Sequence, residues 1–339
     1  MTSKFYSNQE MLDYSDVLIV PCAGNVSSRS DVHLDDIGVI PIIAANMDGV
    51  GTFEMARALS KHKMLTALVK HYTLDELINF FNEDAGRFAF YSMGISDEDI
   101  AKYREFIEAI SSEQVIAPYG ICIDVANGYT DNFLEKLDDI TNIAPEMFYM
   151  AGNVVTPEQV YALSQKGIDV IKVGIGPGSV CTTRKLTGIG FPQFSAVLDC
   201  VKTGMNVCAD GGITCPGDVA KAFGAGAAYV MIGGMFAGHE EGLPPEHKDR
   251  VFITNIPFYG MSSKAAQEIH NGGVANYRAS EGKEVIIKYK GPVDNTVKEL
   301  LGGLRSACTY VGAKDLFEFR DNAQFIRVNR QLNNIFGAS

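Results

Sequence analysis

The sequence predicts an α/β fold, a closed (β/α)8 or TIM barrel with a lid inserted at its C-terminal face. Eight short and continuously apolar runs occur in the first two-thirds of the chain, helix-like stretches separate them, and glycine or polar residues follow most of them. Continuously apolar strands joined by helices imply a parallel sheet covered on both faces. Eight such units fit a closed barrel better than an open doubly wound sheet, which remains the alternative.

The expected strands are runs of four to six residues. They cover residues 41–45, 65–69, 88–92, 120–125, 148–153, 170–173, 206–210 and 229–232. Between them, apolar residues recur at helical spacing. These expected helices cover residues 51–62, 74–82, 97–110, 131–140, 157–166, 194–202 and 216–223.

Residues 235–285 break this alternation with a mixture of aromatic, glycine and charged residues. A segment of this length is too long for an ordinary connection, so we expect an ordered lid over the barrel mouth. Helical spacing resumes over residues 293–301. No linker and no second domain are seen, so residues 1–339 are predicted to form a single barrel domain.

Composition limits the possible partners and the cellular compartment. The net charge of −12 disfavours nucleic acid as a partner, although local backbone N–H groups can still bind a small anion. The seven cysteines are scattered without a CxxC pair, which argues against a disulfide framework or a zinc site. The N-terminus lacks the apolar core of a signal peptide, and no run approaches the length of a membrane span. A cytoplasmic protein with no membrane partner is expected.

The segment 174–193 reads GIGPGSVCTTRKLTGIGFPQ and directly follows an apolar run. Its glycines allow close backbone approach to a ligand, and hydroxyl side chains surround Cys181. This cysteine loop predicts a nucleophile presented to an anionic ligand. A dinucleotide fingerprint is disfavoured because Ser179 stands where GxGxxG requires its third glycine. An inert buried cysteine is the simpler alternative.

Polar residues and glycines gather at the C-terminal ends of the expected strands, which form one face of a barrel, where active sites are built. They include Asn46, Asp48, Lys70, His71, Asp124, Asn127, Gly152, Asn153, Asp210, Gly211, Gly212, Gly233 and Gly234. The glycines after the seventh and eighth strands occupy the usual phosphate position of this fold, although such glycines also form ordinary turns.

Several segments resemble the IMP dehydrogenase/GMP reductase family, and the wider sequence is closest to its GMP reductase members. The matching segments are 41–48, 123–129, 151–156, the cysteine loop, 210–212, 258–263, 277–283 and 301–312. IMP dehydrogenases usually insert paired regulatory domains and carry a flap with an Arg-Tyr pair, and neither is found here. The runs RASEGK and LGGLRSACTYVGA resemble the reductases.

The resemblance implies irreversible, NADPH-dependent reductive deamination of GMP to IMP and ammonia, a step of purine nucleotide salvage and interconversion. It implies that Cys181 attacks purine C2 to give a covalent thioimidate, while Thr183 and Glu281 carry the proton for the leaving ammonia. Three alternatives remain: an IMP dehydrogenase lacking its regulatory domains, a nucleotide-binding regulator without catalysis and, more weakly, a flavin-binding phosphate barrel.

The resemblance also implies ligand positions. Substrate contacts would be Ser179, Asp210, Gly211, Gly212, Gly233, Gly234, Gly260, Met261, Ser262, Arg278 and Gly282. Cofactor contacts would be Ser28, Arg29, Lys70, Asp124, Val125, Ala126 and two residues of an expected turn, Ser306 and Thr309. Backbone oxygens of Gly176, Gly178, Cys181 and Arg184 would hold K⁺, a hard cation suited to oxygen ligands. A homotetramer with cofactor contacts crossing between subunits is implied.

Overall fold

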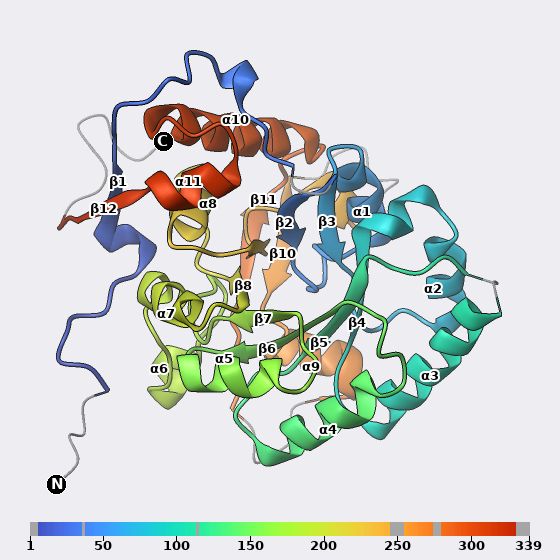
Figure 1. Cartoon of the computed structure of the whole chain (residues 1–339). Helices are drawn as coiled ribbons and strands as arrows, with labels where there is room; N and C mark the ends of the chain where they lie inside the picture. The colour runs from blue at the N-terminus through green and yellow to red at the C-terminus, as the bar shows by residue number, and fades with distance from the viewer. Residues whose placement is uncertain (1–5, 36–37, 113–114, 245–253, 274–278, 330–339) are drawn as a thin grey trace, which may run out of the picture.

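The structure is a computed structural model that describes residues 6–35, 38–112, 115–244, 254–273 and 279–329. Eight parallel strands form a closed barrel in chain order, since β9 returns to pair with β2 (Figure 1). They are β2 (Ile40–Ala44), β3 (Met64–Ala67), β4 (Ala89–Met93), β5 (Gly120–Asp124), β6 (Tyr149–Val154), β7 (Val170–Val173), β8 (Asn206–Asp210) and β9 (Tyr229–Ile232). The predicted barrel is confirmed, and its closure excludes the open sheet.

Helices cover the outside of the barrel. The main ones are α1 (Phe53–Ser60), α2 (Leu74–Phe81), α3 (Asp97–Ser111), α4 (Asp131–Thr141), α5 (Pro157–Ser164), α7 (Gln193–Cys200), α8 (Pro216–Gly224) and α10 (Asp294–Tyr310). Shorter helices are α6 (Thr183–Thr187) and α11 (Leu316–Asn322), with 3-10 turns at η1 (Tyr14–Asp16), η2 (Arg29–Asp31), η3 (Asp84–Phe88), η4 (Val201–Thr203) and η5 (Glu240–Gly242). Among the described residues, none of the helices has the length and apolar character required to cross a bilayer.

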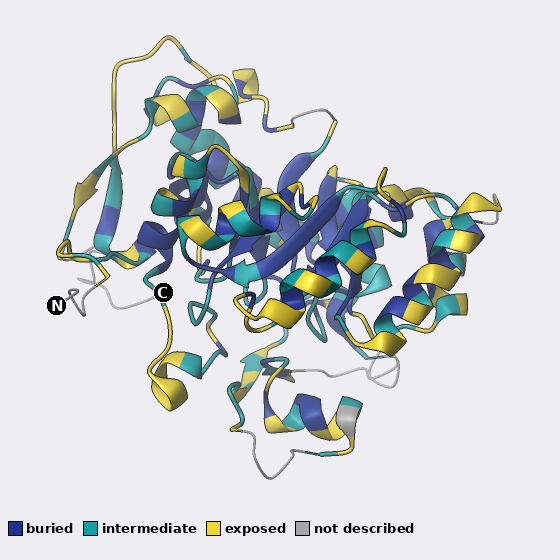
Figure 2. Cartoon of the chain, turned by 60° about the horizontal axis from the view of Figure 1, so that its bottom comes forward, coloured by how far each residue is buried: buried dark blue, intermediate teal, exposed yellow. Residues whose placement is uncertain are grey.

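Local sequence sets where these helices begin. A Thr or Ser precedes α1, α2, α3 and α4, and its hydroxyl accepts a hydrogen bond from a backbone N–H in the first turn. Proline opens α5 and α8, where its missing N–H costs nothing. Every residue of β2, β3, β4 and β7 is buried between the barrel interior and the helices (Figure 2). Burial on both faces explains why the strands read as continuous apolar runs.

Two features of the C-terminal region differ from expectation or were not predicted. The turn expected at residues 306–309 is wrong, because α10 continues to Tyr310. Glycine usually weakens a helix, but Gly303 lies within α10. A Cβ at this position would lie 2.7 Å from the Cβ of Pro216, so glycine lets α10 pack closely on α8. Strand β12 (Gln324–Arg327) pairs antiparallel with β1 (Val17–Val20), which no local pattern indicated.

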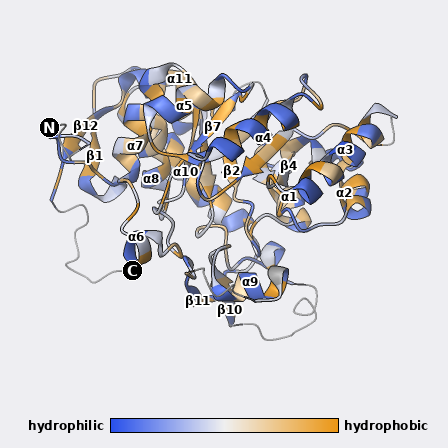
Figure 3. Ribbon diagram, turned by 90° about the horizontal axis from the view of Figure 1, so that it is seen from below, coloured by the Kyte–Doolittle hydropathy of each residue, from blue (hydrophilic) through white to orange (hydrophobic). Residues whose placement is uncertain are grey.

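The segment after β9 contains a further small sheet. Strand β10 (Asn255–Tyr259) pairs antiparallel with β11 (Glu284–Lys288), and α9 (Lys264–Asn271) lies between them in the chain. These elements lie together to one side of the barrel (Figure 3). Their pairing extends past residue 285, where the expected lid ended. Residues 255–273 and 279–288 are called the lid.

Candidate active site

A cavity of about 300 Å³ opens at the C-terminal ends of the strands, between the cysteine loop and the lid. It brings together most of the predicted catalytic and substrate residues. These are Ser179, Cys181, Thr183, Asp210, Gly211, Gly212, Gly233, Gly234, Gly260, Met261, Ser262 and Glu281. Gly282 pairs with Cys181 in an isolated antiparallel bridge, whereas Arg278 lies outside the described residues.

A chain of hydrogen bonds joins the three predicted catalytic side chains. The Cys181 thiol donates to Thr183 Oγ1 over 3.2 Å, and the Thr183 hydroxyl donates to Glu281 Oε2 over 2.7 Å. The backbone fixes this register, because the Thr182 N–H donates to the carbonyl of Glu281 over 2.9 Å. A proton can therefore pass from the sulfur through the hydroxyl to the carboxylate.

The other cysteines lie in different surroundings. Burial raises the pKa of Cys122, Cys200 and Cys308 to about 12, which keeps these thiols protonated and unreactive near neutral pH. Cys22 and Cys215 are exposed and do not line the cavity. Of the seven cysteines, only Cys181 lines the cavity at the C-terminal face.

Glycines open one end of the cavity. A Cβ on Gly234 would lie 2.9 Å from the hydroxyl oxygen of Ser179, so a side chain there would obstruct this corner. Gly212, with φ at +81°, adopts a backbone conformation that other residues rarely take. A concave backbone next to a hydroxyl suits an anionic phosphate group, which exposed N–H groups can bind.

A buried lysine that sequence reasoning missed links the two carboxylates expected to contact the cofactor and substrate. Lys172 of β7 is 1% exposed, and its ammonium pairs with Asp124 and, over 3.3 Å, with Asp210. Asn46 donates to Asp124 over 3.2 Å, and Asn153 donates to Asp210 over 2.8 Å. Lys172 is the only basic residue within the eight apolar runs, and this exception was the feature of the sequence that could have identified it as a site residue.

The charges in this cluster support one another. Burial alone would raise the pKa of Asp124, but the Lys172 ammonium and its hydrogen bond outweigh burial and lower it. Burial would likewise lower the pKa of Lys172, yet Asp124 and Asp210 together hold it well above its ordinary value. The Lys172–Asp124 pair is therefore charged, and the Asp124 side chain, 38% exposed, remains open to the cavity.

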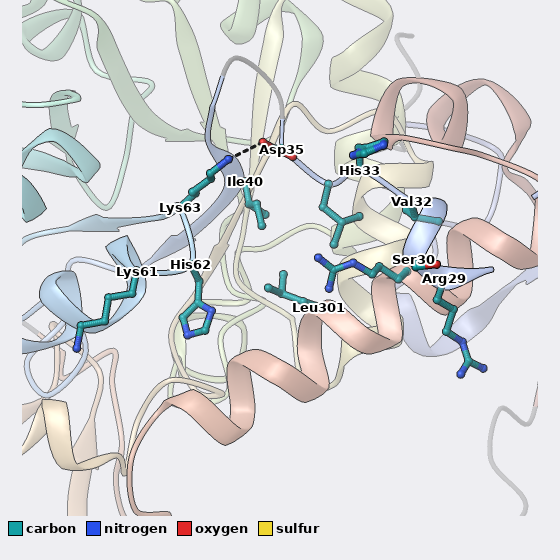
Figure 4. Close-up of a pocket in the computed structure, with 12 residues that line it drawn as sticks. Arg29, Ser30, Val32, His33, Asp35, Ile40, Lys61, His62, Lys63 and Leu301 are labelled. Carbon is teal, nitrogen blue, oxygen red and sulfur yellow. Dashed lines mark hydrogen bonds and ion pairs between the residues drawn. The ribbon is translucent and has the colours of Figure 1, made fainter.

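The predicted cofactor residues fall into two groups in a single chain. Asp124, Val125 and Ala126 line the active-site cavity, and Lys70 follows β3 at the same face. Arg29 lines a second cavity of about 640 Å³ (Figure 4). This cavity lies near the beginnings of β2 and β3, at the opposite end of the barrel from the active-site cavity. Ser28 precedes Arg29, while Ser306 and Thr309 lie on α10, which also borders this second cavity. One chain does not bring the two groups together.

His71 lies at the barrel mouth beside the lid, where its ring stacks on that of His270. Partial burial, together with the nearby His270 and Lys70, lowers its pKa from 6.5 to about 4. The unfolded chain therefore binds a proton as the pH falls below about 6.5, whereas the folded chain does not until about 4.

Stability contributed by neutral His71 is thus expected to be lost progressively as the pH falls from 6.5 towards 4. The variant His71→Phe keeps a ring that cannot titrate, so its melting temperature should fall less than that of the wild type between pH 7 and pH 5. Thermal unfolding at both pH values measures this, with His33→Phe as the matched control. An equal fall in the melting temperatures of the wild type and His71→Phe between pH 7 and pH 5 would contradict the prediction.

Comparison with known proteins agrees with this geometry. The model of the IMP dehydrogenase / GMP reductase domain matches residues 92–333. A protein named GMP reductase from Caenorhabditis elegans is 49% identical over 348 residues, covering 97% of this chain and 95% of the relative. GMP reductase 1 of Homo sapiens is 48% identical, and GMP reductase of Photobacterium profundum is 47% identical; each comparison covers 96% of this chain and 97% of the relative. The chain therefore belongs to the IMP dehydrogenase/GMP reductase family.

Proposed function

We propose that this protein is a GMP reductase, an oxidoreductase that converts GMP irreversibly to IMP and ammonia with NADPH in purine nucleotide interconversion. The observation that carries the proposal is the hydrogen-bonded series Cys181–Thr183–Glu281 facing a cavity at the C-terminal end of the barrel. The names of the relatives support it and disfavour the IMP dehydrogenase alternative. The setting of such chemistry would be the cytoplasm.

The contacts suggest how protons are handled. The Cys181 proton passes through Thr183 to Glu281, and the resulting thiolate attacks C2 of the purine, forming a C–S bond. Glu281 then returns the proton through Thr183 to the departing amine as the C2–N bond breaks, so ammonia leaves and a thioimidate remains. NADPH, when bound, supplies the hydride for C2. Breaking the C–S bond then releases IMP and leaves a thiolate, which takes a proton from solvent to restore the Cys181 thiol.

The residues at the cavity fit the proposed ligands. Ser179 and the glycines after β8 and β9 suit the GMP phosphate, and Asp210 suits a ribose hydroxyl. Asp124, Val125 and Ala126 would hold the nicotinamide end of NADPH, close to Cys181. We further propose a homotetramer in which Ser28, Arg29, Ser306 and Thr309 reach the rest of the cofactor from a neighbouring subunit.

A monovalent cation such as K⁺ also fits the cysteine loop. The carbonyl of Gly178 accepts the Cys181 N–H over 3.1 Å, while no described residue donates a hydrogen bond to the carbonyls of Gly176 or Cys181. Arg184 lies in α6, with its side chain paired to Asp13 over 2.9 Å. The described residues form no His, Cys, Asp or Glu cluster for a metal, so the ligands would be backbone oxygens, as K⁺ prefers.

The proposed activity is tested by following the absorbance of reduced nicotinamide when the purified protein meets GMP. NADPH and NADH are compared in parallel, and IMP with NAD is the control for the dehydrogenase reaction. Oxidation of NADPH with formation of IMP and ammonia is expected. Reduction of NAD by IMP with no reaction of GMP would instead favour a dehydrogenase, and no turnover in any assay would favour a binding protein.

Replacing Glu281 with Gln should lower kcat by about 10²–10⁴-fold with a much smaller change in the KM for GMP, because proton transfer to the leaving amine is lost. Thr183→Val should have a similar effect, since it interrupts the same series. Steady-state kinetics measure both, with Thr182→Val as the control because its hydroxyl contacts only the carbonyl of Ser280 in the described chain. Equal kcat values in Thr183→Val and Thr182→Val would rule out the relay.

A further inference from the structure

The lid is attached to the barrel at two separate places. At the first, backbone hydrogen bonds join the lid to the cysteine loop, and the Lys283 N–H donates to the carbonyl of Val180 over 2.9 Å. This attachment carries Glu281, and therefore holds the proton relay. The second attachment lies at the loops that follow β2 and β3, and it consists mostly of side-chain contacts.

Asp48, in the loop after β2, is the centre of the second attachment. Its Oδ2 accepts hydrogen bonds from the Tyr259 hydroxyl over 2.9 Å and from His270 Nε2 over 2.7 Å. Its backbone N–H lies 3.4 Å from the sulfur of Met261. One residue of the barrel thus contacts the end of β10, the turn after it and the last turn of α9.

His71, in the loop after β3, completes the attachment. Its ring stacks on that of His270, with centroids 3.6 Å apart and planes inclined by 5°. The side chains of His270 and Asp48 are only 16% and 18% exposed, so their contact is largely shielded from water. Lys70 and Lys102 add positive charge near His71, and Asp48 adds the compensating negative charge.

We propose that Asp48 is a positioning residue which, with His71 and His270, forms a latch that holds the lid in register over the substrate. The name "latch" denotes these three side chains. The inference rests on the proposed function for the identity of the substrate, but the latch itself follows from the contacts. Met261 and Ser262 line the nucleotide cavity directly between the two lid elements that Asp48 holds.

The two attachments predict separable effects on kinetics. Because the relay is held at the cysteine loop, releasing the latch should leave the chemical step nearly intact. Releasing it should loosen the lid's contacts with the nucleotide, and so weaken binding. Latch variants are therefore expected to raise the KM for GMP by about tenfold while changing kcat by less than about threefold. This pattern is expected when the bound substrate and the transition state lose the same binding energy.

The experiment compares two substitutions at His270 that separate its contacts. His270→Phe keeps a ring for stacking but loses the donor to Asp48, whereas His270→Gln keeps a donor and loses the ring. His270→Phe should show the tenfold rise in KM. His270→Gln keeps the contact with Asp48 and loses only the stack on His71, so it should show a smaller rise, of about threefold. Ile269→Ala, an exposed neighbour on the same helix, is the matched control.

Hydrogen exchange of backbone amides gives a second readout that does not depend on turnover. In His270→Phe and Asp48→Ala, amides of β10 and α9 should lose protection while those of the barrel strands keep theirs, which also shows that the variants are folded. The double variant should be no worse than Asp48→Ala alone, since Asp48→Ala already removes the contact that His270→Phe loses. Additive effects, or protection and KM equal to those of the wild type, would overturn the latch. A wild type inactive towards GMP would instead refute the proposed function, and exchange would still test the latch.

Discussion

Replacing Cys181 with alanine should abolish turnover, with a loss on the order of 10⁴-fold or more, as expected for an enzyme that loses its covalent nucleophile. Binding of GMP should remain close to that of the wild type, because the cavity keeps its glycines, its hydroxyl groups and the Lys172 cluster. Cofactor oxidation measures turnover, calorimetric titration with GMP measures binding, and intact mass after acid quenching detects the covalent adduct in the wild type alone.

Cys215→Ala is the matched control, since it removes the same group from an exposed position outside the cavity. It should retain the wild-type rate. Substantial turnover by Cys181→Ala would exclude covalent catalysis through this sulfur. Loss of GMP binding together with turnover would instead make Cys181 a binding residue.

Replacing Lys172 with methionine should be the most destabilising of the proposed changes. Methionine fills a similar volume but leaves Asp124 and Asp210 facing each other without the buried ammonium. Removing one partner of a buried ion pair typically costs about 3–5 kcal/mol of the free energy of unfolding. Binding of GMP and of NADPH should weaken together, because Lys172 orients the carboxylates expected on both ligands. Urea denaturation and separate titrations with each ligand measure the two effects.

Lys202→Met is the control for this change, because Lys202 forms a surface pair with Asp199 that should contribute about 1 kcal/mol or less. Adding Asp124→Asn to Lys172→Met should recover part of the stability, since one of the two opposed charges is then removed. If Lys172→Met and Lys202→Met lost the same small amount of stability, the buried pairing would not support the site. Recovery of stability without recovery of NADPH binding would assign the ligand effect to Asp124 itself.

The barrel was predictable from the sequence because its signals are local. The eight apolar runs lie within about two residues of the observed strand ends, since strands buried on both faces must be apolar throughout. Thr52, Thr73, Ser96 and Thr130 mark helix starts through contacts with their own first turn. The cysteine loop could be found for the same reason, as its glycines, hydroxyls and thiol are consecutive in the chain.

Contacts between distant segments were decided only by the tertiary structure. In the sequence, Lys172 is a charged residue within an apolar strand and has no evident partner. In the closed barrel it pairs with both Asp124 and Asp210. His270 contacts Asp48 across 222 positions of sequence, and β1 pairs with β12 from the opposite end of the chain. The sequence by itself therefore determined the strands, the helix starts and the cysteine loop, whereas the charged cluster and the latch depend on which strand ends become neighbours in the closed barrel. Contacts between residues so far apart in the chain produce no repeating pattern in the sequence around either residue. They could therefore not be predicted from local sequence.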